Sequence, residues 1–383
     1  MVVFKPAPFK VDICKEDLET LRKKLQLTRL PTEISESEWG EKNGVTVAFM
    51  REMVDHWLHE YDWDREQAKI NDLPQFTVEI ELDDFGIFDI HFVHVRTDQP
   101  DAIPLLFLHG WPGNFTEAFK VIGHLESAGY HIVVPSLPGY GFSSYTHKPG
   151  FKNWHHAEIM HQLMIGLRYD KYVVAGGDWG AMITGSMALK YPESVQAIYL
   201  TNVFVQPPED KDQLKYSDFE LNSLAIMQRF SESESAYGQV QSTKPRTLGL
   251  ALHDSPVGML AWMADKLLLW ADAYPWTKDE IITWTLLHYL PGPATAFAMY
   301  RENLSVFASG QTAPGVKERY VSTPTGVSAF ANEVFMVPRS WAERDFNIVS
   351  WNEQSRGGHF PAHERPEELC ADMIPFLKAH WKA

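Results

Sequence analysis

Cysteine is scarce in this chain of 383 residues, with Cys14 and Cys370 the two present. Two cysteines are too few for the disulfide framework of a small secreted protein, so the sequence predicts a reducing, cytoplasmic location. Runs of about 20 apolar residues are also missing. Residues 1–19 reach proline and charged residues within a few positions and contain no apolar signal segment. We therefore expect a soluble protein without a membrane anchor.

Positive charge is in deficit, because 34 Lys and Arg stand against 50 Asp and Glu and give a net charge of −16. Such a chain repels phosphate groups at long range, which argues against nucleic acid and anionic membranes as partners. The HExxH motif, a cysteine-rich cluster and a GxGxxG opening a first βα unit are absent as well. We expect no cofactor and no bound metal.

Aromatic residues are plentiful, with 13 Trp, 14 Tyr and 22 Phe. They suit an apolar substrate cavity, although a core built from large side chains explains them equally well. Amphipathic patterns predict helices over residues 16–30, 46–60 and 64–71, in a stretch without catalytic groups. Alternating residues then predict a hairpin over 76–96 with its turn at 83–86.

Short apolar runs follow and are the strongest indication of the fold class. Helix-like segments such as 116–128 and 154–167 flank the first four, which predicts an α/β protein with a mostly parallel sheet. The runs occupy residues 104–108, 131–134, 172–175, 197–200 and 327–330. The alternation stops between 205 and 310, where a helical insertion would cover the ends of the strands. We predict four parts: a bracing segment (1–75), a core (76–204), a helical lid (205–310) and the rest of the core (311–383).

The run at 172–175 leads into the sequence GGDWGA. Gly176 and Gly180 flank Asp178 with the spacing of a nucleophile elbow, in which a sharp strand-to-helix turn leaves no room for Cβ atoms. An ordinary turn with an Asp helix cap fits the same residues. The carboxylate itself is informative, because its attack on a saturated carbon forms an ester that water can cleave, whereas serine would form a stable ether. Asp178 thus points to epoxides or alkyl halides.

The motifs HGWP at 109–112, PGYGFS at 138–143, GGDWGA and a late GGH at 357–359 occur in this order. Together they resemble the α/β-hydrolase fold and, more narrowly, the microsomal-type epoxide hydrolases with their soluble fungal and bacterial relatives. LQLTRLP at 25–31 resembles the extra N-terminal segment of that branch. The resemblance spans almost the whole chain.

The GGH context and the chain order nucleophile, acid, histidine indicate His359 as the base. The resemblance places the acid that orients it at Glu333, with Asp345 and Glu353 as competitors. His363, at a helix start, is interpreted as structural.

The alkoxide that leaves an opened epoxide needs a proton donor. The resemblance assigns this role to Tyr237 and Tyr300 of the lid, which would otherwise be ordinary packed residues. It further implies an oxyanion hole formed by the backbone N–H groups of Trp111 and Trp179. In the family that the chain resembles, the peptide bond before the proline at position 112 is often cis.

The sequence therefore predicts the hydrolysis of a small apolar epoxide by water to a vicinal diol, through an ester on Asp178. A haloalkane dehalogenase with the same nucleophile is the alternative, and an inactive relative that acts as a binding protein is a third interpretation. A homodimer is one candidate for the oligomeric state.

Overall fold

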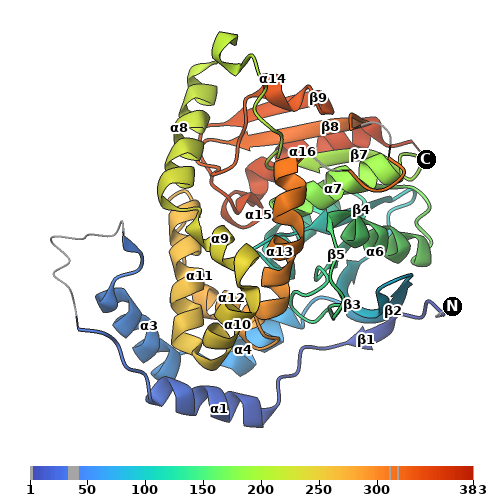
Figure 1. The fold of residues 1–383 in the computed structure, drawn as a ribbon. Coiled ribbons are helices and arrows are strands. Elements are labelled where there is room, and N and C mark those ends of the chain that lie inside the picture. The colour runs from blue at the N-terminus through green and yellow to red at the C-terminus, as the bar shows by residue number, and fades with distance from the viewer. Residues whose placement is uncertain (1–2, 33–42, 310–311, 317–318, 383) are drawn as a thin grey trace.

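The computed structural model describes residues 3–32, 43–309, 312–316 and 319–382. Across these residues a nine-stranded sheet has the order β1-β2-β3-β5-β4-β6-β7-β8-β9. Helices cover both of its faces, and a block of further helices lies along one side (Figure 1). The alternation of strands and helices predicted from the sequence is confirmed.

The first three strands are antiparallel: β1 (Ala7–Phe9), β2 (Gln75–Leu82) and β3 (Gly86–Val95). The predicted hairpin joins β2 to β3, and its turn places Asp84 and Gly86 in the left-handed region with φ values of 63° and 96°. β3 then pairs antiparallel with β5. β1 was not predicted, because three residues are too few to show an alternating pattern.

The remaining strands are parallel to one another, and all but the last, β9, correspond to the apolar runs. They are β4 (Ile103–Leu108), β5 (Tyr130–Pro135), β6 (Tyr172–Gly176), β7 (Val195–Leu200), β8 (Val321–Phe330) and β9 (Phe346–Gln354). The helices that accompany them are η2 (Phe115–Ala118), α5 (Phe119–Ser127), α6 (Asn153–Gly166), α7 (Trp179–Lys190), α14 (Arg339–Ala342), α15 (Pro361–Glu364) and α16 (Pro366–His380). Because β4 and β6 are buried along their whole length, they hold their carboxyl ends rigidly.

Between β7 and β8 the chain forms the helical block. It consists of η3 (Lys211–Gln213), α8 (Asp218–Ser233), α9 (Ala236–Thr243), α10 (Pro245–Asp254), α11 (Pro256–Trp270), α12 (Lys278–Tyr289) and α13 (Ala294–Ser309). Local signals set several of its boundaries: Ser217 and Thr277 form capping boxes, and Ser255 caps α11 immediately before Pro256. Within the described residues, no helix is both long and apolar enough to span a membrane.

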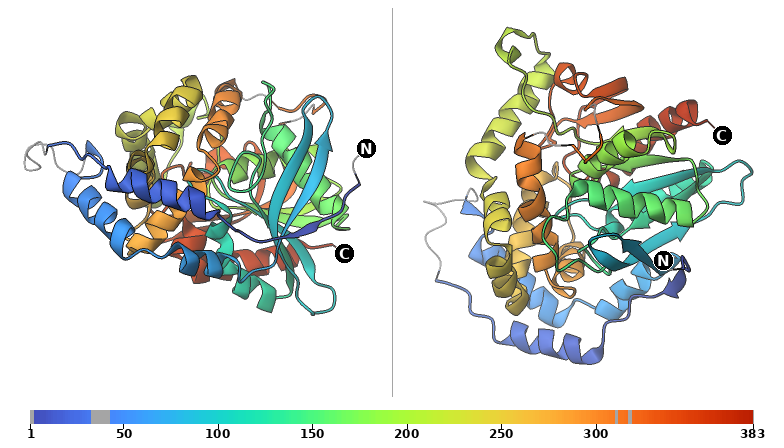
Figure 2. Two further views of the ribbon diagram at one scale, coloured as in Figure 1. Left: turned by 90° about the horizontal axis from the view of Figure 1, so that it is seen from below. Right: turned by 45° about the vertical axis from the view of Figure 1, so that its right-hand side comes forward.

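The N-terminal helices are α1 (Lys15–Gln26), α3 (Val47–His59) and α4 (Trp63–Ile70). α1 and α3 pack against α11 of the helical block, as the view from below shows (Figure 2). The prediction that the first helix extends to residue 30 is wrong, because α1 ends at Gln26. Leu27 is 80% exposed, so no buried face continues the helix, and Pro31 disfavours helical backbone at the residue before it.

Candidate active site

Asp178 lies on the sharp turn between β6 and α7. Its φ of 51° and ψ of −129° are unusual for a residue with a side chain, and such a conformation costs on the order of 1–3 kcal/mol. A hydrogen bond of 2.9 Å from its own backbone N–H to Asn202 Oδ1 helps to hold the turn. The glycines are sterically required: a Cβ atom at Gly180 would lie 2.2 Å from the Leu108 carbonyl oxygen, and one at Gly176 would lie 2.6 Å from that of Gly180.

The carboxylate of Asp178 faces the carboxyl end of β4 and the late histidine. Its Oδ1 accepts a hydrogen bond of 2.9 Å from the Trp111 backbone N–H, and its Oδ2 lies 3.5 Å from His359 Nε2. The amide of Trp179 makes no comparable contact with this carboxylate among the described residues. The peptide bond between Trp111 and Pro112 is cis.

His359 is buried and lies between the carboxylates of Glu333 and Asp178. Its Nδ1–H donates to Glu333 Oε1 at 2.8 Å, and Glu333 is itself fixed by the backbone N–H of Phe335 at 2.9 Å. Burial alone would lower the pKa of His359, but Glu333 and then Asp178 outweigh it and hold this pKa well above the ordinary value. The two carboxylates therefore favour the protonated form of the imidazole in the resting protein.

The competing carboxylates lie elsewhere. Asp345 pairs with Arg319 at 3.0 Å, and Glu353 is on β9, so Glu333 is the predicted acid that reaches the imidazole. His363 stacks on Trp276 with ring centroids 4.9 Å apart, beneath α12.

The two tyrosines line the same cavity as Asp178, with Tyr237 on α9 and Tyr300 on α13. Their ring centroids are 5.7 Å apart; Trp111 stacks on Tyr237 at 5.0 Å, and Trp179 packs edge-on against Tyr300 at 4.9 Å. Burial raises the pKa of both phenols, and the charge of Asp178 raises it further. The Tyr300 hydroxyl lies near that of Tyr237 but makes no hydrogen bond that meets full geometric limits with any described residue. Both phenols are thus protonated and able to donate.

A cavity of about 360 Å³ opens beside these residues. Asp178, Tyr237 and Tyr300 form part of its wall, and the rest is mostly apolar and aromatic. Its apolar side chains include Met182, Met227, Phe230, Leu304, Phe335 and Trp341. Such a cavity suits a small apolar molecule that presents one polar atom to the phenols.

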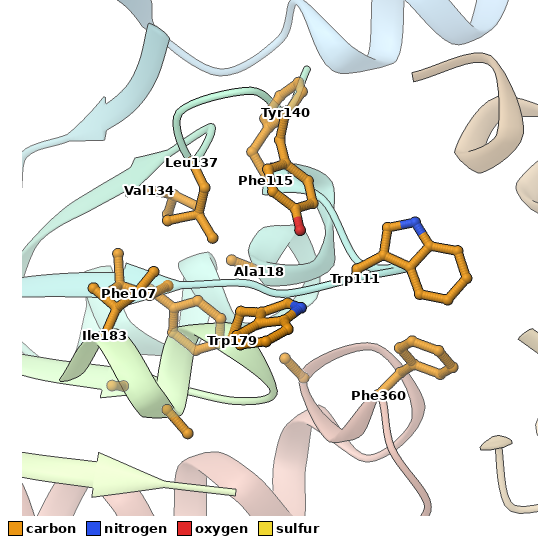
Figure 3. Packing of buried hydrophobic residues seen from close by; sticks show 14 of the residues in the cluster. Phe107, Trp111, Phe115, Ala118, Val134, Leu137, Tyr140, Trp179, Ile183 and Phe360 are labelled. Carbon is orange, nitrogen blue, oxygen red and sulfur yellow. The ribbon is translucent and has the colours of Figure 1, made fainter. Parts of the chain in front are cut away.

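Buried aromatic side chains pack around Trp111 and Trp179 (Figure 3). In this view the hydroxyl end of Tyr140 points between the indole rings of Trp111 and Trp179, with Phe360 facing them from below. Trp111, Tyr140 and Phe360 are almost fully buried.

Three polar residues near the site were not predicted from the sequence. Asn202 holds the turn of Asp178 and could have been found as a polar residue directly after a buried strand. Glu364 accepts backbone N–H bonds from Gly358 at 3.1 Å and Phe360 at 2.8 Å, on both sides of His359; its place within the GGHFPAHE sequence was the available signal. Glu117 lies on η2 and had no sequence signal.

The sheet order, the turn at Asp178 and the helices inserted after β7 define an α/β-hydrolase. A family model of the alpha/beta hydrolase fold matches residues 103–276, and a model of the epoxide hydrolase N terminus matches residues 6–118. Epoxide hydrolase 1 of Sus scrofa is 31% identical over 409 residues, which cover 97% of this chain and 88% of that protein. The chain belongs to the epoxide hydrolase family of α/β-hydrolase-fold enzymes.

Solved structures agree. The Aspergillus niger epoxide hydrolase structure is 32% identical, with a TM-score of 0.89 over 99% of this chain and 98% of that chain. The juvenile hormone epoxide hydrolase of Bombyx mori is 26% identical, with a TM-score of 0.88 over 99% and 95% of the two chains. The predicted family, fold class and enzyme class are therefore confirmed, with epoxide and water as the reactants.

Proposed function

We propose that this epoxide hydrolase works through a covalent ester on Asp178. The observation that carries the proposal is the position of this carboxylate, 2.9 Å from the Trp111 amide and 3.5 Å from the His359 imidazole, at the wall of a cavity that both phenols share. A nucleophile, a base and proton donors thus surround one space.

In the first step, an oxygen of Asp178 attacks a ring carbon of the epoxide and forms a C–O bond as the ring C–O bond breaks. Tyr237 and Tyr300 hydrogen-bond to the epoxide oxygen, and one of them gives it a proton. The resulting tyrosinate regains a proton from the imidazolium of His359 through solvent. The products are a hydroxyalkyl ester and a neutral imidazole.

Loss of the charge on Asp178 in this step prepares the second. The carboxylate helps to hold the pKa of His359 high, so its conversion to a neutral ester lowers that pKa and favours the basic imidazole. His359, oriented by Glu333, then removes a proton from water, which attacks the ester carbonyl carbon. Cleavage of the acyl C–O bond releases the diol and restores the ionised Asp178.

The tetrahedral intermediate of this step carries a negative oxygen. The Trp111 amide already contacts Asp178 Oδ1 and is one donor of the proposed oxyanion hole. The Trp179 amide, the other predicted donor, would have to reach this oxygen as the carbonyl becomes tetrahedral.

Isotope labelling tests the mechanism. In a single turnover in H₂¹⁸O, the diol should contain unlabelled oxygen from Asp178, and the peptide that contains Asp178 should gain one ¹⁸O. Asp178→Ala should abolish turnover, and His359→Gln should accumulate an alkylated protein visible by intact mass. Label from the water in the diol that the first turnover forms would contradict the ester intermediate.

One observation favours a second candidate, haloalkane dehalogenation. The indole N–H groups of Trp111 and Trp179 are buried and have no hydrogen-bond partner among the described residues, so they could face a halide. The phenol pair and the family favour the epoxide. Bromide release from a bromoalkane as fast as diol formation would reverse this order.

The proposal extends to the kind of epoxide, the division of the chain, the oligomeric state and the location in the cell. The apolar cavity supports a small apolar epoxide, which a panel of aryl and aliphatic epoxides would test. We also retain the four-part division of the chain, in which residues 205–310 act as a lid. The homodimer and the cytoplasmic location remain predictions that light scattering and cell fractionation would check.

A further inference from the structure

A second, much smaller space adjoins Asp178. Its volume is about 10 Å³, and its lining residues are Gly110, Trp111, Gly113, Glu117, Gly177, Asp178, His359 and Phe360. Of the described residues, Asp178 is the one that lines both this space and the substrate cavity. A space of this size holds about one water molecule, provided that polar groups are there to bind it.

Glu117 is the polar group of this space to which the proposed reaction gives no role. It is buried, 9% exposed, on the short helix η2, which Asn114 caps through the Thr116 backbone N–H at 2.9 Å. Its Oε2 lies where a side chain at Gly113 would begin, because a Cβ atom there would be 2.4 Å away. The glycine therefore makes room for the carboxyl group.

The hydrogen bonding of Glu117 also points to a small ligand. In the described part of the chain, the carboxyl group is influenced by burial and by neighbouring charges rather than by a hydrogen-bond donor, although buried carboxyl groups normally find donors. Burial raises the pKa of Glu117 to about 8; His359 opposes this rise and Asp178 adds to it. The carboxyl group is thus largely neutral at pH 7, and its carbonyl oxygen can accept a hydrogen bond without competing for a proton.

We infer that Glu117 binds the hydrolytic water in this space, between its own carboxyl group and the imidazole of His359. The inference rests on the proposed function and identifies a further catalytic residue for its second step. One hydrogen of the water points to Glu117 and the other to His359 Nε2. The oxygen lone pair is then free to face the carbonyl carbon of the Asp178 ester. When the oxygen attacks, the proton moves to His359, while Glu117 keeps its own.

Two substitutions at Glu117 test this. Glu117→Met fills a similar volume without an acceptor, and Glu117→Gln restores a carbonyl oxygen. Rapid mixing with a reactive epoxide, followed by acid quench and intact-mass analysis, measures ester formation and ester hydrolysis separately. Glu126→Gln on the neighbouring helix α5 serves as the control for loss of a carboxyl group outside the site.

In Glu117→Met we expect hydrolysis to slow by about tenfold or more, the equivalent of at least one lost hydrogen bond, with ester formation unchanged. Glu117→Gln should recover hydrolysis to within about threefold of the starting rate, and Glu126→Gln should not differ from the parent. Hydrolysis at the parent rate in Glu117→Met overturns the inference, as does equal slowing of both steps or a failure of Gln to recover the rate. If the parent enzyme itself forms no ester, the proposed function fails instead.

Discussion

Replacing Gly110 with alanine tests whether the carboxylate of Asp178 has to lie where it does. A Cβ atom at position 110 would be 2.2 Å from Asp178 Oδ1, 2.4 Å from its Cβ and 2.6 Å from its Cγ. Non-bonded carbon and oxygen atoms need more than about 3 Å, so the Asp178 side chain has to retreat by about 1 Å. It then loses good geometry with the Trp111 amide and with His359. Misplacement by this distance costs roughly 10²-fold in rate, so we expect kcat to fall by about 10²–10³-fold.

The assay separates lost activity from lost stability. Overpacking costs about 1–3 kcal/mol, so Gly110→Ala should remain folded, with a modest fall in the midpoint of urea unfolding. Gly123→Ala on helix α5 is the matched control, because a Cβ atom at this position would meet no other atom within 4 Å. It should gain about 0.5–1 kcal/mol and keep full activity.

Gly180→Ala should behave differently from Gly110→Ala. Its Cβ atom would lie 2.2 Å from the carbonyl oxygen of Leu108 and 2.8 Å from that of His109, and this backbone cannot retreat as a side chain can. We expect loss of soluble, cooperatively folding protein.

If Gly110→Ala turns over within about threefold of the parent at unchanged stability, catalysis does not depend on the position that Asp178 occupies, and the steric reasoning is wrong.

Further predictions concern proton transfer and pH. Tyr237→Phe and Tyr300→Phe should each slow ester formation by roughly 10²-fold, measured in single turnovers, and the double variant should form no ester; undiminished rates would leave the phenols without a role. The pKa of His359 is raised on folding, so its stabilisation is complete below pH ~6.5 and is lost as pH rises through the folded-state pKa. His359→Gln should therefore destabilise more at pH 6 than at pH 9 in urea titrations, and an equal loss at both would contradict the ion-pair assignment. Glu117 behaves oppositely, because its pKa is about 8 in the folded protein against an ordinary 4.5. The free energy of unfolding therefore falls as pH rises from 4.5 to 8, since the unfolded chain loses this proton more readily than the folded protein does. Glu117→Gln should gain stability at pH 8, by at most about 5 kcal/mol, and none at pH 4.

The sequence predicts those elements whose side-chain pattern repeats. The runs at 104–108 and 172–175 are continuously apolar and the hairpin alternates, and their strands lie within two residues of the predicted positions. β8 begins at Val321, whereas the sequence predicts its start at residue 327. The prediction starts too late because Thr323, Pro324 and Thr325 interrupt the apolar run. Pairing with β9, rather than local pattern, makes that segment a strand.

The site divides in the same way. Asp178 and His359 stand in motifs whose spacing is dictated by steric limits, as the close approach of Gly180 to Leu108 shows. Glu117 has no such mark, since a glutamate one turn into a short helix is usually a surface residue. Only the fold turns η2 towards His359, and no local sequence pattern encodes that orientation.

The carboxyl groups around His359 have the same chemistry but different surroundings, and this difference assigns their roles. Glu333 accepts hydrogen bonds from the Phe335 amide and the imidazole, and Asp178 accepts one from the Trp111 amide, so both anions have donors that offset burial. Glu364 accepts two backbone bonds beside His359 and a third from the Asp272 amide. Glu117 has no such donors among the described residues, and a proton is the simplest way to remove its charge. An anion at Glu117 would hold the imidazole protonated after Asp178 is esterified and would block the second step. A neutral acid can bind the water and leave His359 free to act as the base.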